Sequence, residues 1–150
     1  MNPFGFQINN SYLELPSELY TQQAAKPVKA PSIILLNEDL AREIGLSSEQ
    51  LGTPEGVAIL SGNSKIEGVS PFAQAYSGHQ FGYFTQLGDG RALMLGEHLT
   101  PNSQSIDIQL KGSGPTPYSR RGDGRASLGP MLREYLISEA MAQLDRKSVV

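Results

Sequence analysis

The chain has 150 residues, of which 39% are hydrophobic and 18% are charged, and its formal net charge is −3. This length supports one substantial core, and the composition is typical of a folded globular protein rather than of a disordered segment. The negative charge argues against a general nucleic-acid-binding surface, and the lack of cysteine excludes disulfides, zinc–thiolate sites and cysteine nucleophiles.

The amino terminus carries no targeting pattern. Residues 1–7 contain neither a basic stretch nor a long apolar one, and no apolar run in the chain approaches membrane-spanning length. We therefore expect a cytoplasmic protein with no membrane or nucleic-acid partner.

Residues 1–70 are predicted to form an irregular N-terminal arm with short helices that pack on the rest of the chain. Prolines interrupt this part repeatedly, and the apolar run at residues 33–36 indicates one short buried strand. Asn37 is placed to cap a helix over residues 38–44, and Gly45 to end it. A second short helix is expected over residues 53–59.

The pattern changes in residues 71–150, which we expect to form the nucleotide-binding part. Two apolar runs, 83–87 and 91–97, flank a glycine turn and predict a β-hairpin. Residues 106–111 alternate strictly, so their apolar side chains should face the core while Lys111 projects from the other face.

A loop and the longest helix of the chain follow. Glycines and prolines predict a loop over residues 112–124. Ser127 is a candidate cap for a helix over residues 128–144, with Pro130 in its first turn. Apolar residues recur every fourth position and are flanked by others, so we expect this helix to be buried on more than one side.

The pentapeptide Gly-Asp-Gly-Arg-Ala occurs twice, at residues 88–92 and 122–126, and Lys111 lies between the copies. Glycine lets the backbone approach a ligand closely, and arginine and lysine supply positive charge to phosphate oxygens. The arrangement predicts a polyphosphate site. One copy alone would more simply be a structural turn, and a strand-end lysine alone a solvated residue.

We compared this arrangement with three known phosphate-binding sequence patterns. The dinucleotide pattern requires a third glycine and the Walker loop requires glycine-lysine-serine or threonine, and neither fits. The protein-kinase order fits better: a glycine turn between strands, then Lys111 on the third strand, then Glu134 on a helix to pair with it. His79 and His98 have no metal-ligand spacing and are interpreted as structural.

Several segments together closely resemble the selenoprotein O family, called YdiU in bacteria. The likeness extends to about Leu144, and its most specific segments are Tyr76-Ser77-Gly78-His79-Gln80-Phe81-Gly82, Gln86-Leu87-Gly88-Asp89-Gly90-Arg91-Ala92, Leu110-Lys111-Gly112-Ser113-Gly114-Pro115-Thr116-Pro117-Tyr118-Ser119-Arg120, Gly122-Asp123-Gly124-Arg125-Ala126 and Arg133-Glu134-Tyr135-Leu136.

The resemblance implies an α+β fold like a protein-kinase N-lobe, with an antiparallel sheet, one principal helix and the irregular N-terminal arm. It implies a protein adenylyltransferase that transfers AMP from ATP to serine, threonine or tyrosine hydroxyls of protein substrates, with Mg²⁺ or Mn²⁺; some members are described as transferring UMP. Carried over by motif position, the nucleotide-binding residues would be Gly88, Gly90, Arg91, Lys111, Asp123 and Gly124. Glu134 would form a buried ion pair with Lys111.

Family members are several times longer, and the resemblance implies that the catalytic base and metal ligands lie in a C-terminal lobe beyond residue 150. We therefore expect no catalytic or metal-binding residue in this chain, which would be inactive alone. The last six residues, 145–150, also depart from the family pattern. Two alternatives stay open: a non-catalytic nucleotide-binding or pseudokinase lobe, and a segment that does not fold stably by itself.

Overall fold

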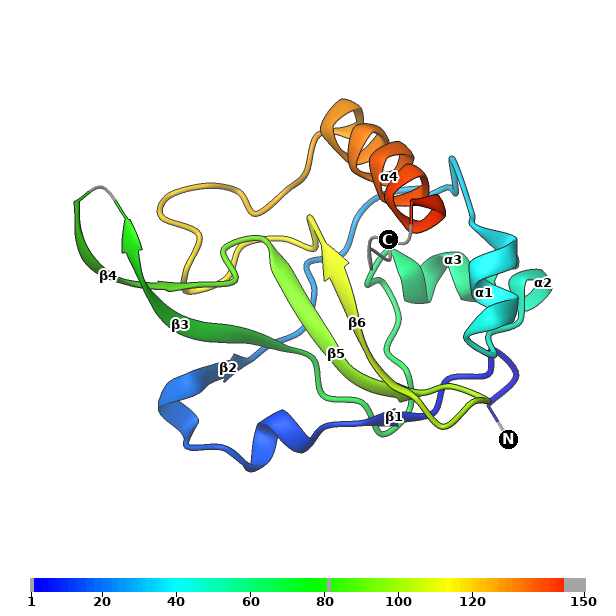
Figure 1. The fold of residues 1–150 in the computed structure, drawn as a ribbon, viewed down its shortest axis with the longest axis horizontal. Coiled ribbons are helices and arrows are strands. Elements are labelled where there is room, and N and C mark those ends of the chain that lie inside the picture. Colours follow the sequence, from blue (N-terminus) through cyan, green and yellow to red (C-terminus); the bar gives the residue numbers. More distant parts are fainter. Residues whose placement is uncertain (1, 81, 145–150) are drawn as a thin grey trace.

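Six strands form one antiparallel sheet in the computed structural model of the chain, which describes residues 2–80 and 82–144 (Figure 1). The strands are β1 (Ile8–Asn9), β2 (Tyr20–Gln22), β3 (Phe72–Gln80), β4 (Tyr83–Gly88), β5 (Ala92–Leu99) and β6 (Ser105–Lys111). The α-helices are α1 (Glu38–Glu43), α2 (Ser48–Leu51), α3 (Pro54–Leu60) and α4 (Leu128–Gln143), with 3₁₀ turns at Ser11–Glu14 and Ser17–Leu19. The predicted α+β class is confirmed, while Phe81 and the atypical residues 145–150 lie outside the described residues.

The predicted hairpin between residues 83–87 and 91–97 is wrong. Both β4 and β5 pair antiparallel with β3, β4 from Ala75↔Gly88 onward and β5 at Phe72↔Met94, so they run in the same direction. The glycine segment between β4 and β5 therefore interrupts the pairing with β3 and does not reverse the direction of the chain. The hairpin of this region is β3–β4, which extends away from the rest of the sheet (Figure 1).

Local capping signals place the short helices as predicted. The side chain of Asn37 accepts a hydrogen bond from the Leu40 N–H at 3.0 Å, and Gly45 follows α1 with φ +85°. Thr53 caps α3 in the same way. The strand expected at residues 33–36 is absent from the described chain, since these residues pair with no strand and Ile34 is 60% exposed.

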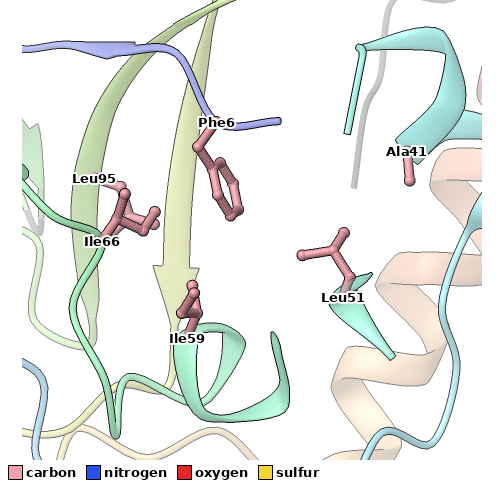
Figure 2. Packing of buried hydrophobic residues seen from close by; sticks show 6 residues of the cluster. All are labelled: Phe6, Ala41, Leu51, Ile59, Ile66 and Leu95. Carbon is pink, nitrogen blue, oxygen red and sulfur yellow. The ribbon is translucent and has the colours of Figure 1, made fainter. Parts of the chain in front are cut away.

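The core lies between the sheet and the short helices. Phe6 of the arm, Leu95 of β5 and Ile66 meet Ile59 of α3, as Figure 2 shows, with Ala41 and Leu51 extending the cluster through α1 and α2. Partly buried residues of β6 pack against the same cluster, so the predicted inward face of residues 106–111 is confirmed.

His98 joins the sheet to the arm and to α1. Its ring is 1% exposed, its Nδ1 accepts a hydrogen bond from the Gln7 N–H at 3.1 Å, and its Nε2 lies 2.8 Å from the Ile44 carbonyl oxygen. Because Nδ1 accepts, Nε2 carries the proton and donates to Ile44. This confirms the structural interpretation of His98.

Helix α4 begins and ends within one residue of the prediction, but its expected burial is wrong. Ser138 is its one buried residue within the described part, and Leu136 is 67% exposed. Ser127 occupies the N-cap position without a side-chain cap bond. The helix lies along the outside of the lobe (Figure 1), and Leu128, Leu132, Leu136 and Ile137 are exposed on it.

Candidate functional site

The first glycine turn is held against β3 by paired backbone and side-chain bonds. The Asp89 N–H donates to the Gln74 carbonyl at 2.9 Å, and the Gln74 N–H donates to the Asp89 carboxylate at 3.1 Å. Burial raises the pKa of Asp89, and the bond from Gln74 opposes part of that rise. Asp89 therefore anchors the turn, which leaves Arg91 exposed beside it.

The second glycine turn closes the loop that follows β6. The Gly114 N–H donates to the Gly124 carbonyl at 3.1 Å, and Gly124 has φ +68°. A Cβ atom at this position would overlap the Gly114 carbonyl group, so only glycine fits. The Asp123 carboxylate accepts from the Arg125 N–H at 2.9 Å and shapes the turn.

Two hydroxyl groups fasten this loop to the first turn. Thr116 donates to the Asp89 carbonyl and Ser119 to the Gly90 carbonyl, both at 2.5 Å. The ring of Tyr118 lies directly over Gly88, where any Cβ atom would overlap it. The two copies of the pentapeptide, which are distant in sequence, are thus joined through one loop.

Both turns line a single open pocket of about 670 Å³. Five of the six predicted nucleotide-binding residues form part of its wall: Gly88, Gly90, Arg91, Asp123 and Gly124. The wall also includes Arg120 and Arg125, so the lining holds three arginines and a single carboxylate, that of Asp123. That charge balance favours an anionic ligand rich in oxygen acceptors, such as a polyphosphate.

The sequence interpretation did not select Arg120, Tyr118 or Tyr76, which also line the pocket. The backbone around Arg120 gives an independent sign of a constrained site, because Arg120 and Arg121 have φ +51° and +79°. Left-handed backbone is uncommon outside glycine and clusters at binding sites. The sequence signal that could have identified them is the run Tyr118-Ser119-Arg120-Arg121, which directly precedes the second pentapeptide.

Lys111 lies outside this pocket lining but next to it. It ends β6 opposite Ala92, and the following Gly112 N–H donates to the Arg91 carbonyl at 2.6 Å. Its ammonium group forms an ion pair with the Glu134 carboxylate of α4. The predicted pairing is therefore present in the structure, but the prediction that it is buried is wrong, because the side chains are 37% and 43% exposed.

The kinase-like order of elements is also altered in one respect. The strand hairpin that precedes Lys111 is β3–β4, with Gly78 within β3 and Gly82 at its turn, and not the Gly88–Gly90 segment. The Gly88–Gly90 segment instead lies where β4 gives way to β5. Arg91, which immediately precedes β5, and Lys111, which ends β6, thus lie at the same end of the sheet.

The described residues offer little for a metal ion. No group of three or more histidine or acidic side chains in residues 2–80 and 82–144 is arranged to hold one. His79 is exposed on β3 opposite Phe84. In the same described residues, no helix is long and apolar enough to cross a membrane.

Comparison with known proteins identifies relatives over nearly the whole chain. The family model described as protein adenylyltransferase SelO matches residues 4–149. A protein nucleotidyltransferase YdiU from Bacillus cytotoxicus is 59% identical over 140 residues, which cover 93% of this chain and 28% of that protein. Proteins of the same name from Anoxybacillus flavithermus and Bacillus cereus are 59% and 58% identical, and the chain covers 29% and 30% of them. The chain thus spans less than a third of the curated relatives it matches.

Proposed function

Since the chain belongs to the SelO family, we propose that the intact protein transfers a nucleotide from a nucleoside triphosphate to hydroxyl groups of other proteins. The observation that carries this proposal is the joining of both Gly-Asp-Gly-Arg turns in one pocket whose lining has three arginines. The relatives' printed name, protein nucleotidyltransferase, supports the reaction class. In this proposal residues 71–150 carry the nucleotide-binding lobe and residues 1–70 pack on it.

The proposed reaction is a substitution at the α-phosphorus. The oxygen of a serine, threonine or tyrosine side chain forms a bond to the α-phosphorus, the bond to the α,β-bridging oxygen breaks, and pyrophosphate leaves. The hydroxyl proton passes to a base. Such transfers depend chiefly on positioning and on positive charge placed around the phosphates.

This chain's residues would supply binding and orientation. Gly88, Gly90 and Gly124 allow the backbone to approach the phosphates, and the Arg91 guanidinium can engage their oxygens in pairs. Asp123 shapes the second turn and lines the pocket, and we assign it to nucleotide binding. Lys111, aimed by Glu134, would add a further positive charge at the end of β6.

A divalent metal, Mg²⁺ or Mn²⁺, is usual for nucleotide transfer. The described residues do not fit a resident ion, because the pocket lining contains a single carboxylate, that of Asp123. In this proposal the described residues bind and orient the nucleotide, and none of them holds the metal.

The test is incorporation of label into protein by the intact protein. Transfer from α-³²P-labelled ATP would indicate adenylyl transfer, our first choice, and transfer from α-³²P-labelled UTP would indicate uridylyl transfer. We expect Arg91→Ala and Lys111→Ala to abolish most incorporation, and Arg133→Ala, which removes an exposed arginine of α4, to leave it unchanged. Binding of ATP without transfer to any protein would instead indicate a non-catalytic nucleotide-binding lobe.

A further inference from the structure

The two arginines of the repeated pentapeptide have different surroundings. Among the described residues, the Arg91 side chain has no hydrogen-bond or ion-pair partner and is exposed to the pocket. The Arg125 guanidinium instead donates through Nη2 to the carbonyls of Lys26 and Pro27, at 3.0 and 3.3 Å. It also donates through Nη1 to the Gly112 carbonyl at 3.4 Å. Identical local sequences therefore present one available guanidinium and one that is engaged.

The Arg125 contacts belong to a larger set between the N-terminal arm and the pocket loop. The Lys26 N–H donates to the Ser113 carbonyl at 2.8 Å, and the Gln23 amide donates to the Pro115 carbonyl at 2.8 Å. The hydroxyl groups of Thr21 and Tyr118 are 3.0 Å apart. We name residues 21–27 the arm strap, because they follow the loop from Tyr118 back to Ser113.

The arm strap thus bonds to the same loop that fastens the two turns together. Tyr118 covers Gly88 of the first turn while its hydroxyl contacts the strap, and Arg125 immediately follows the second turn. The strap therefore contacts the loop at Ser113, Pro115 and Tyr118 and also contacts Arg125, the residue that follows the second turn.

We propose that Arg125 is a positioning residue: by binding the carbonyls of the arm strap, it sets the geometry of the pocket and hence its affinity for nucleotide. The inference rests on the proposed function. It makes the arm part of the nucleotide site, although Lys26 and Arg125 are 99 positions apart in the sequence. Arg125 acts here through the strap and not by touching phosphate, because its donors are already directed at backbone carbonyls.

The test measures the Kd of the intact protein for ATP by calorimetric titration. Arg125→Ala is expected to raise Kd about tenfold, because charge-assisted bonds to three carbonyls are lost. Arg125→Lys keeps the charge but reaches fewer carbonyls, and should recover part of the loss. Arg133→Ala, which removes an exposed positive charge of α4, should leave Kd unchanged. The melting temperature of each variant is measured alongside.

A second substitution disturbs the strap from its own side. Gln23→Ala removes the bond to the Pro115 carbonyl without altering the pocket lining. We expect it to raise Kd about threefold, and the double variant to show less than the product of the two effects, because both act on one strap. Gln22→Ala, an exposed neighbour in β2, is the matched control.

Two results would overturn this proposal, and a third would refute the proposed function on which it rests. An unchanged Kd in Arg125→Ala would overturn it, and so would fully multiplicative effects of Arg125→Ala and Gln23→Ala together with a weaker salt dependence, which would identify Arg125 as a direct phosphate ligand. Failure of the unmodified protein to bind any nucleotide would refute the proposed function itself, before any variant is compared.

Discussion

Gly124→Ala tests whether the second turn is packed as tightly as the structure indicates. Gly124 has φ +68°, and an alanine held in left-handed backbone costs about 1–2 kcal/mol. Its Cβ atom would also overlap the Gly114 carbonyl and the Pro115 nitrogen, so the loop has to move. Movement breaks the bond from the Gly114 N–H to the Gly124 carbonyl, a further cost of about 1 kcal/mol. The expected loss in the free energy of unfolding is about 2–3 kcal/mol.

Gly68→Ala is the matched control for this loss. Gly68 has φ +77°, but no atom lies within 4 Å of the position its Cβ would take, so the backbone cost of about 1–2 kcal/mol stands alone. Urea unfolding of the wild type and both variants measures the difference, and amide exchange at Gly114 reports the local opening. Equal losses in the two variants, with Gly114 still protected in Gly124→Ala, would refute the close approach of the two loop ends.

Three further predictions concern single side chains. Glu134→Gln should lower nucleotide transfer less than Lys111→Ala and change the melting temperature little, because the half-exposed pair contributes under about 1 kcal/mol to stability. His98→Phe should lower the free energy of unfolding by about 2–4 kcal/mol in urea titrations, since two buried backbone groups lose their partner. Burial raises the pKa of Asp89, so the folded state holds that proton more tightly and stability from this group falls as pH rises above 3.8. Asp89→Asn should therefore gain stability relative to wild type between pH 4 and pH 7 in urea unfolding, and a constant difference would contradict this.

The parts of the fold that the sequence predicted correctly depend on neighbouring residues. The caps at Asn37 and Thr53 act on N–H groups three residues away, and the alternation in β6 follows from strand geometry alone. The errors arose where the structure of a segment depends on elements that are distant in the sequence. Residues 33–36 are apolar enough for a strand but have no strand beside them, and α4 has helical periodicity but leaves most of its leucines exposed.

The hairpin error has the same origin. Alternating residues on both sides of Gly88–Gly90 do form strands, but β3 is their common neighbour. Its pairing with β4 at Ala75–Gln80 and with β5 at Phe72 replaces the expected pairing of β4 with β5. A glycine turn between strands is consistent with a reversal and with a bulge, and only the third strand distinguishes them.

The repeated pentapeptide shows the same division between features set by local sequence and features set by distant contacts. Its glycines and aspartates shape two bends from local sequence, and that part was predictable. The use of each arginine was not, because it is decided by what lies opposite: open pocket for Arg91, and backbone carbonyls of Lys26 and Pro27 for Arg125. A guanidinium engaged by neutral carbonyls keeps its charge, so Arg125 still adds to the positive potential of the pocket while its position is fixed. Duplication of a motif therefore supplies charge twice, and the tertiary contacts determine which copy is available to bind and which maintains the spacing between them.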